Sequence, residues 1–335
     1  MSFAARSRAF GRSWLAVSAA AAIALLTGCS SGADEADEAA AAGSEGFPIT
    51  VEHAMGETTV ESEPMTIVAL DSSYVDAAVA LELDVVGRIT YAAGDEALPA
   101  YLGEEGRTYA GDATIVGDLE APDLAEVAEL EPDLIVSAKV RHEDVYDQLS
   151  RIAPTVFSET TGATWKDNIE LLARATGKED LAAEKLDAYH ERAAALGEAI
   201  TEESGGEAPT MTLARFVGGP KVRLYSSNSF TGIVQSDVGL PRPEGAPDAA
   251  DDISVDLSQE EILDLDADHI FVSVWNDGTG ESQKGADEFA TNPLWDQLEG
   301  EQHQVDDTEW LTSVSLQGAN AILDDMEEAF GVQAQ

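Results

Sequence analysis

The sequence is poor in cysteine, in basic residues and in aromatic residues. Its single cysteine, Cys29, excludes an internal disulfide framework. Only 18 lysine and arginine residues stand against 65 aspartate and glutamate residues, which gives a formal net charge of −47. Nucleic-acid binding requires clustered basic side chains, so this charge excludes nucleic acid as a partner. We interpret the acidity as a heavily solvated surface that says little about any ligand.

Sequence motifs of enzymes are also absent. The chain has no G-x-S-x-G elbow, no G-x-x-x-x-G-K-[ST] phosphate loop, no H-E-x-x-H and no dinucleotide-binding G-x-G-x-x-G after a strand. A metal site requires converging imidazoles or carboxylates. The histidines are scattered and include no H-x-H pair: His53, His142, His190, His269 and His303. We therefore expect no catalytic residue, no cofactor and no metal ion held by the protein itself.

The first 28 residues are typical of a signal peptide. Three arginines precede an apolar run from Trp14 to Leu26, which is too short to cross the ~30 Å hydrocarbon core of a membrane. The run ends in Leu26-Thr27-Gly28-Cys29, which resembles a lipobox. This resemblance implies that Cys29 is lipidated and that the protein is exported and anchored to the outer face of the cell membrane. The alternative is a plain secretory signal with a coincidental cysteine.

Residues 29–46 are rich in small and acidic side chains and predict a flexible tether. The remainder predicts an α/β fold, because strand-sized apolar runs such as 133–137 and 269–274 alternate with helix-periodic segments. We expect two Rossmann-like lobes with mainly parallel sheets, residues 47–177 and 204–335. One long helix over residues 178–203 joins them in this prediction. The alternative is a surface helix inside one larger domain.

An internal repeat supports two equivalent lobes. Residues 126–136 align without a gap with residues 261–271, 135 positions later. Both segments place an acidic turn between a helical pattern and a buried strand. The matched apolar positions make a chance similarity of two acid-rich segments a poorer explanation.

The chain resembles the substrate-binding lipoproteins of iron-siderophore ABC transporters, from about Glu61 to Phe330. Six segments in family order carry the resemblance: Val68–Tyr74, Leu81–Gly87, Val116–Pro122, Leu130–Ile135, Ile152–Val156 and Arg223–Phe230. The resemblance implies a ligand cleft between the lobes and capture of a ferric siderophore whose iron the siderophore itself coordinates. It also implies delivery to an ABC permease for iron uptake, by a protein that is a monomer. Similarity of the 223–230 segment to hydroxamate-binding relatives favours a hydroxamate siderophore.

A ferric siderophore offers anionic oxygens and a partly apolar scaffold, which basic, aromatic and hydroxyl side chains can bind. Such side chains lie at or near the ends of predicted strands in both lobes. In the first lobe these candidates are Ser72, Ser73, Tyr91, Lys139 and Arg141, and in the second they are Arg215, Arg223, Tyr225, Asn228 and Trp275. Each has an ordinary alternative, namely a surface ion pair or core packing. Arg141 and Arg223 are the strongest candidates.

The same resemblance implies that one carboxylate on each lobe contacts the permease. Glu260 occupies the second-lobe position, whereas the first lobe has Ala125 there, so the adjacent Glu126, or Glu120, is the candidate. The ordinary alternative for these glutamates is stabilisation of a helix N-terminus. As alternatives for the ligand we keep haem, cobalamin, or a zinc or manganese ion delivered to an ABC importer.

Overall fold

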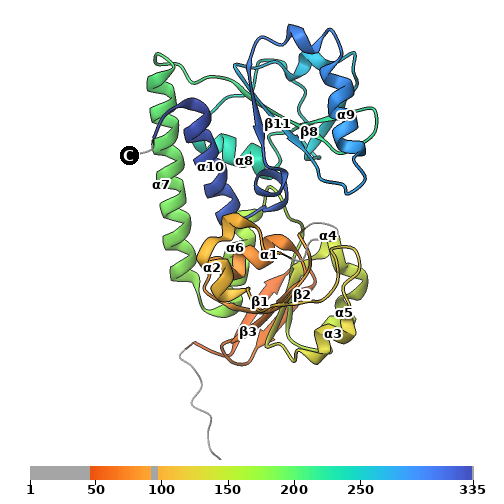
Figure 1. Cartoon of the computed structure of the whole chain (residues 1–335). Coiled ribbons are helices and arrows are strands. Elements are labelled where there is room, and N and C mark those ends of the chain that lie inside the picture. The colour runs from red at the N-terminus through yellow and green to blue at the C-terminus, as the bar shows by residue number, and fades with distance from the viewer. Residues whose placement is uncertain (1–45, 92–96, 334–335) are drawn as a thin grey trace, which may run out of the picture. The chain divides into compact units, whose positions relative to one another are not determined.

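Strands and helices alternate along the chain, as the apolar runs of the sequence predict. The computed structural model describes residues 46–91 and 97–333, which belong to one compact unit (Figure 1). The predicted signal peptide, Cys29 and nearly all of the predicted tether lie outside the described residues. Within the described residues, no helix combines the length and apolarity needed to cross a membrane.

The first lobe carries a five-stranded sheet and a separate two-stranded hairpin. Its strands are β1 (Ile49–His53), β2 (Gly56–Val60), β3 (Thr66–Ala69), β4 (Asp84–Arg88), β5 (Thr114–Ile115), β6 (Leu134–Ala138) and β7 (Thr155–Ser158). Its helices are α1 (Ser72–Ala80), η1 (Ala100–Leu102), α2 (Gly103–Tyr109), α3 (Leu124–Glu129), α4 (Lys139–His142), η2 (Glu143–Val145), α5 (Tyr146–Leu149) and α6 (Trp165–Thr176). Every pairing in the sheet β5-β4-β3-β6-β7 is parallel.

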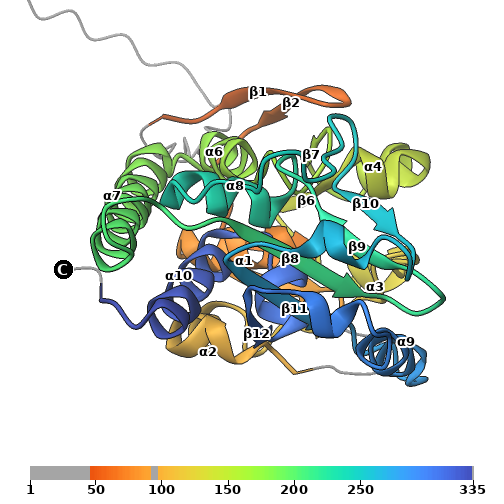
Figure 2. The same ribbon diagram turned by 90° about the horizontal axis from the view of Figure 1, so that it is seen from above.

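The second lobe follows the long helix α7 (Glu179–Glu203). Its strands are β8 (Met211–Phe216), β9 (Val222–Tyr225), β10 (Ser254–Leu257), β11 (His269–Val274) and β12 (Glu301–Val305). Its helices are α8 (Phe230–Val238), η3 (Ile262–Leu265), α9 (Glu281–Ala290), η4 (Trp295–Gln297), η5 (Thr308–Thr312) and α10 (Leu316–Phe330). Figure 2 shows α9 on one side of this sheet and α8 and α10 on the other.

The second sheet has the order β10-β9-β8-β11-β12, and β9 runs antiparallel to both of its neighbours. Only residues 217–221 separate β8 from β9, whereas a parallel crossover needs a dozen or more residues. Parallel pairing therefore extends over the whole first sheet and over β8, β11 and β12 in the second.

The two lobes share a pair of hydrogen bonds between an aspartate and a threonine at the start of their central strands. The carboxylate of Asp133 accepts hydrogen bonds from the backbone nitrogen and the hydroxyl of Thr66, both at 2.9 Å. Asp268 binds the same two atoms of Thr210, both at 2.7 Å. Asp133 and Asp268 are matched positions of the internal repeat, so the repeat recognised in the sequence is also a structural one.

Helix α7 packs against α6 in the first lobe and against α8 and α10 in the second (Figure 1). Its 25 residues span about 37 Å at 1.5 Å per residue. Asp237 of α8 accepts hydrogen bonds from Lys166 of α6 at 2.6 Å and from Tyr189 of α7 at 2.9 Å. One continuous apolar core includes α7 and the α7-facing sides of both sheets. Both lobes are therefore joined by packing as well as by chain connectivity.

Candidate functional site

In the first lobe, an ion pair between Asp71 and Arg141 lies just after the carboxyl end of β3. Asp71 caps α1, because its carboxylate accepts hydrogen bonds from the backbone nitrogen of Ser73 at 3.0 Å and from its hydroxyl at 2.6 Å. The other oxygen of Asp71 accepts from Nε of Arg141, in α4 just after β6, at 3.2 Å. The Arg141 side chain is 35% exposed. Among the described residues no other partner engages its guanidinium, so both terminal nitrogens are available to an anionic ligand.

The remaining first-lobe candidates have partners within the protein. Lys139 donates to Glu159 at 2.9 Å, and this hydrogen bond raises the pKa of Lys139. The hydroxyl of Ser72 donates to the carbonyl of Thr312 at 3.0 Å and so links the first lobe to η5 of the second. Tyr91 is buried and donates to Asp76. The side chains of Lys139 and Ser72 are partly exposed, whereas the hydroxyl of Tyr91 is used in a hydrogen bond inside the protein.

In the second lobe, Arg215 lies in a buried polar network near the end of β8. Its Nε and Nη2 donate to the two carboxylate oxygens of Asp307 at 2.7 and 2.6 Å. Its Nη1 donates to the hydroxyl of Tyr225 at 3.1 Å, and Ser273 also donates to Asp307, at 2.7 Å. This bidentate pair fixes the guanidinium plane. Arg215 therefore orients Tyr225, and contact of either residue with a ligand stays a prediction.

Three second-lobe candidates are open to solvent. The Arg223 side chain is 40% exposed, and its Nε lies 4.0 Å from Asp256, a weak surface pair. Trp275 follows β11 and is 40% exposed, which is unusual for so large an apolar side chain. Asn228 is exposed and donates to the carbonyl of Ala250 at 3.3 Å. Arg223 pairs with Arg215 in the sheet register, so the two arginines share one face.

The tryptophans differ in exposure. Trp165 and Trp310 are 1% and 0% exposed. The ring nitrogen of Trp310 donates to Asp325 at 2.7 Å. These two rings belong to the core, Trp295 is half-buried and donates from its ring nitrogen to Gln302 at 3.1 Å, and Trp275 is the most exposed of the tryptophans that the structure describes.

A buried carboxylate that the sequence analysis missed joins the lobes. Asp76 of α1 is 0% exposed and accepts hydrogen bonds from Tyr91, from Tyr101 at 2.8 Å and from Ser315 at 2.6 Å. Ser315 is the N-cap of α10 in the second lobe. Burial raises the pKa of Asp76 to about 7, although the three hydroxyl donors oppose this shift. The partners are up to 239 residues away in sequence, so no local pattern reveals them.

A hollow of about 660 Å³ lies where α1, α7 and α10 meet. Its lining includes no predicted ligand residue. Its cations are already paired, since Arg192 donates to Asp324 and to Glu327, and Lys185 lies 3.7 Å from Glu82. We therefore do not assign the ligand to this hollow.

Both permease-docking candidates are exposed. Glu126 lies in the first turn of α3, and Glu260 lies two residues before the start of η3. Within the described part of the chain, neither carboxylate has a hydrogen-bond or ion-pair partner. By contrast, Glu261, which matches Glu126 in the repeat, accepts from the backbone and hydroxyl of Ser258 at 2.9 and 2.8 Å. Both candidates are thus free to contact another protein.

The structure also brings together two histidines that the sequence analysis treated as scattered. Nδ1 of His269 lies 2.9 Å from Nε2 of His303. Burial lowers the pKa of both imidazoles. The sequence contained one indication of this cluster: Glu301 and His303 are two residues apart, so they share a face of a strand.

Comparisons with known proteins agree with this architecture. Residues 67–304 match the periplasmic binding protein family. The probable siderophore-binding lipoprotein YfiY of Bacillus subtilis is 34% identical over 84% of this chain and 87% of its own length. The Fe(3+)-citrate-binding protein YfmC of the same organism is 29% identical over 76% and 77% of the two chains.

Among solved structures, Staphylococcus aureus SirA complexed with staphyloferrin B superimposes with a TM-score of 0.75 at 28% identity. The superposition covers 85% of this chain and 99% of SirA. These relatives are binding proteins and not enzymes, as the absence of catalytic motifs led us to expect. The chain belongs to the periplasmic binding protein family.

Proposed function

We propose that this protein captures a ferric siderophore outside the cytoplasm and delivers it to an ABC permease for iron uptake. The observation that carries the proposal is the similarity to YfiY, a probable siderophore-binding lipoprotein, over most of both chains. The similarity to SirA, solved with staphyloferrin B, supports the same ligand class. Lipidation at Cys29 would hold the protein, as a monomer, at the outer face of the membrane.

Recognition of the ligand would rest on Arg141 and Arg223. Arg141 lies in α4 just after β6, and Arg223 is the second residue of β9. Each guanidinium is partly exposed, and neither is fully engaged by the protein's own carboxylates. Charge-assisted hydrogen bonds to anionic oxygens are about twice as strong as neutral ones. Trp275 would supply an apolar face. Since the siderophore already coordinates the iron, the protein contributes no metal ligand to the complex.

Two ligand types compete within this proposal. The sequence segment 223–230 favours a hydroxamate siderophore, which needs few cations. The similarity to YfmC, an Fe(3+)-citrate-binding protein, favours a citrate-type ligand, whose carboxylates suit paired guanidinium groups. Delivery would use Glu260 and Glu126 as the permease contacts.

Tryptophan fluorescence of the purified protein tests the proposal. The titrants are ferrioxamine, ferrichrome, ferric citrate, a ferric catecholate, haem, cobalamin and zinc, with inner-filter controls for the coloured compounds. We expect saturable quenching by one ferric siderophore class at micromolar or lower concentration. Trp275→Phe should reduce the quenching, because it removes the fluorescent indole. It should weaken binding only by as much as the smaller phenyl ring loses in contact with the ligand. A response confined to haem, cobalamin or zinc would contradict the proposal.

A further inference from the structure

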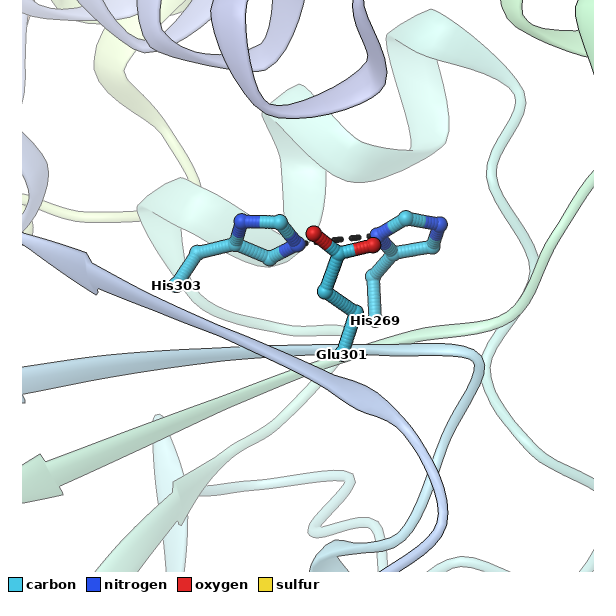
Figure 3. Close-up of side chains that lie close together, drawn as sticks. All are labelled: His269, Glu301 and His303. Carbon is cyan, nitrogen blue, oxygen red and sulfur yellow. Dashed lines mark hydrogen bonds between the residues drawn. The ribbon is translucent and has the colours of Figure 1, made fainter.

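The strongest unassigned cluster lies at the amino ends of β11 and β12. His269 is the first residue of β11, and Glu301 and His303 are the first and third residues of β12. One ligand atom from each of the three residues lies within 4.8 Å of the others. Figure 3 shows the Glu301 carboxylate beside the line that joins the two ring nitrogens. The predicted ligand residues Arg215 and Trp275 lie toward the other end of these strands.

The sheet register explains why the three side chains meet. His269 pairs with Glu301 and Phe271 pairs with His303, so all four side chains share one face. The rings are held in place by packing: His303 stacks on Phe271 with ring centroids 4.8 Å apart, and His269 lies 4.2 Å from the ring of Phe330. The two imidazoles are therefore pre-oriented before any ligand arrives.

The equivalent strand positions of the first lobe carry different residues. The internal repeat matches His269 with Leu134, and the strand registers match His303 with Val156. Leu134 and Val156 are 0% and 1% exposed. Two imidazoles thus occupy positions that are purely apolar in the equivalent lobe.

Surrounding charge favours a cation. His303 lines a hollow of about 450 Å³ whose other walls include four carboxylates: Asp306, Glu309, Asp325 and Glu328. Burial and, to a smaller extent, the neighbouring carboxylates raise the pKa of both Glu309 and Asp325. The hollow therefore gives a cation an acidic approach path to His303.

We propose that His269, Glu301 and His303 form a binding site for a divalent transition-metal ion of the zinc type. Two imidazoles and one carboxylate are a recurrent zinc ligand set that leaves the fourth position to water. Tetrahedral bonds of 2.0–2.1 Å place ligand atoms about 3.3 Å apart. The nitrogen separation of 2.9 Å therefore has to widen by about 0.4 Å, and the Glu301 oxygen, which lies within 4.8 Å of both nitrogens, has to approach them by up to about 1.5 Å. The bound ion would tie the edge strand β12 to β11, independently of the siderophore.

Calorimetric titration of the purified protein with Zn²⁺, in excess Mg²⁺ to occupy ordinary surface carboxylates, tests this site. We expect one Zn²⁺ per chain, a rise in melting temperature with Zn²⁺, and visible absorption bands of four-coordinate cobalt after Co²⁺ substitution. The double variant His269→Leu/His303→Val, which installs the first-lobe residues, should abolish all three effects. The matched control His190→Gln, an exposed histidine on α7, should change none of them.

A second variant keeps the test independent of core packing. Glu301 is exposed, so Glu301→Gln should leave the fold intact, as circular dichroism would verify, and weaken Zn²⁺ binding about tenfold or more. Absence of saturable Zn²⁺ binding would overturn the proposal. So would saturable binding that Glu301→Gln and the double variant both leave unchanged, because the ion would then sit on other carboxylates.

Discussion

Ionisation of the buried Asp76 should make the free energy of unfolding depend on pH. Its carboxyl group has a pKa of about 7 in the folded protein, compared with 3.8 in the unfolded chain. The native state therefore binds more protons than the unfolded state between pH 4 and 7, and the free energy of unfolding must fall as pH rises through this window. At 1.36 kcal/mol per pKa unit, the fall amounts to about 4 kcal/mol.

The substitution Asp76→Asn tests this reasoning. An amide keeps the shape of the carboxyl group and can still bond Tyr101 and Ser315, whose hydroxyls rotate to donate or accept. It does not titrate, so the variant should lose this component of the pH dependence. The comparison is the difference in unfolding free energy between the two proteins, because the many other carboxylates contribute equally to both.

The assay is urea unfolding of both proteins at several pH values from 4 to 8. We expect the stability of the variant relative to the native protein to rise by about 4 kcal/mol from the acidic to the neutral end. A difference that stays constant across this range would refute the raised pKa. A difference of the opposite slope would show that Asp76 ionises more easily in the folded state, with its three hydroxyl donors outweighing burial.

Three further predictions concern the site, docking and packing. Arg141→Ala and Arg223→Ala should each weaken ferric siderophore binding by about 1.5–3 kcal/mol in a fluorescence titration, with an unchanged circular dichroism spectrum; unchanged affinity in both would remove them from the site. Glu260→Ala should reduce siderophore uptake by cells while affinity stays the same, and a loss of affinity would refute the docking role. A β-carbon at Gly197 would lie 1.8 Å from the carbonyl oxygen of Val238, so Gly197→Ala should lower the free energy of unfolding by about 1–3 kcal/mol. Glu198→Ala, its exposed neighbour, should change it by less than about 0.5 kcal/mol.

Local patterns were sufficient for the elements and for several individual side chains. The run 269–274 is β11 as expected, because four of its six residues are β-branched or aromatic and the run has no competing helical period. The predicted helix 178–203 corresponds to α7 (Glu179–Glu203), and the Gly205-Gly206 break follows its end. Arg141 lies in α4 just after β6 and Arg223 is the second residue of β9, so the sequence located both beside strands, and their contact with a ligand stays a prediction.

Contacts between distant segments could not be predicted in this way. Asp307 pairs with Arg215 across 92 residues, which turns a candidate ligand residue into the anchor of a buried network. Tyr91 likewise turns toward Asp76. The His269–His303 pair depends on the β11–β12 register, which connection length and core packing set together. In each case only the tertiary structure identified the partner.

Calorimetric titration with a ferric siderophore and with its iron-free form decides whether this protein captures ferric siderophores. We expect the purified protein to bind the ferric complex at micromolar or lower concentration, one per chain, and to bind the iron-free form more weakly. Iron binding fixes the siderophore's conformation and oxygen positions, so less ordering is needed on association. Saturable binding of haem or cobalamin, with no binding of any ferric siderophore, would contradict it.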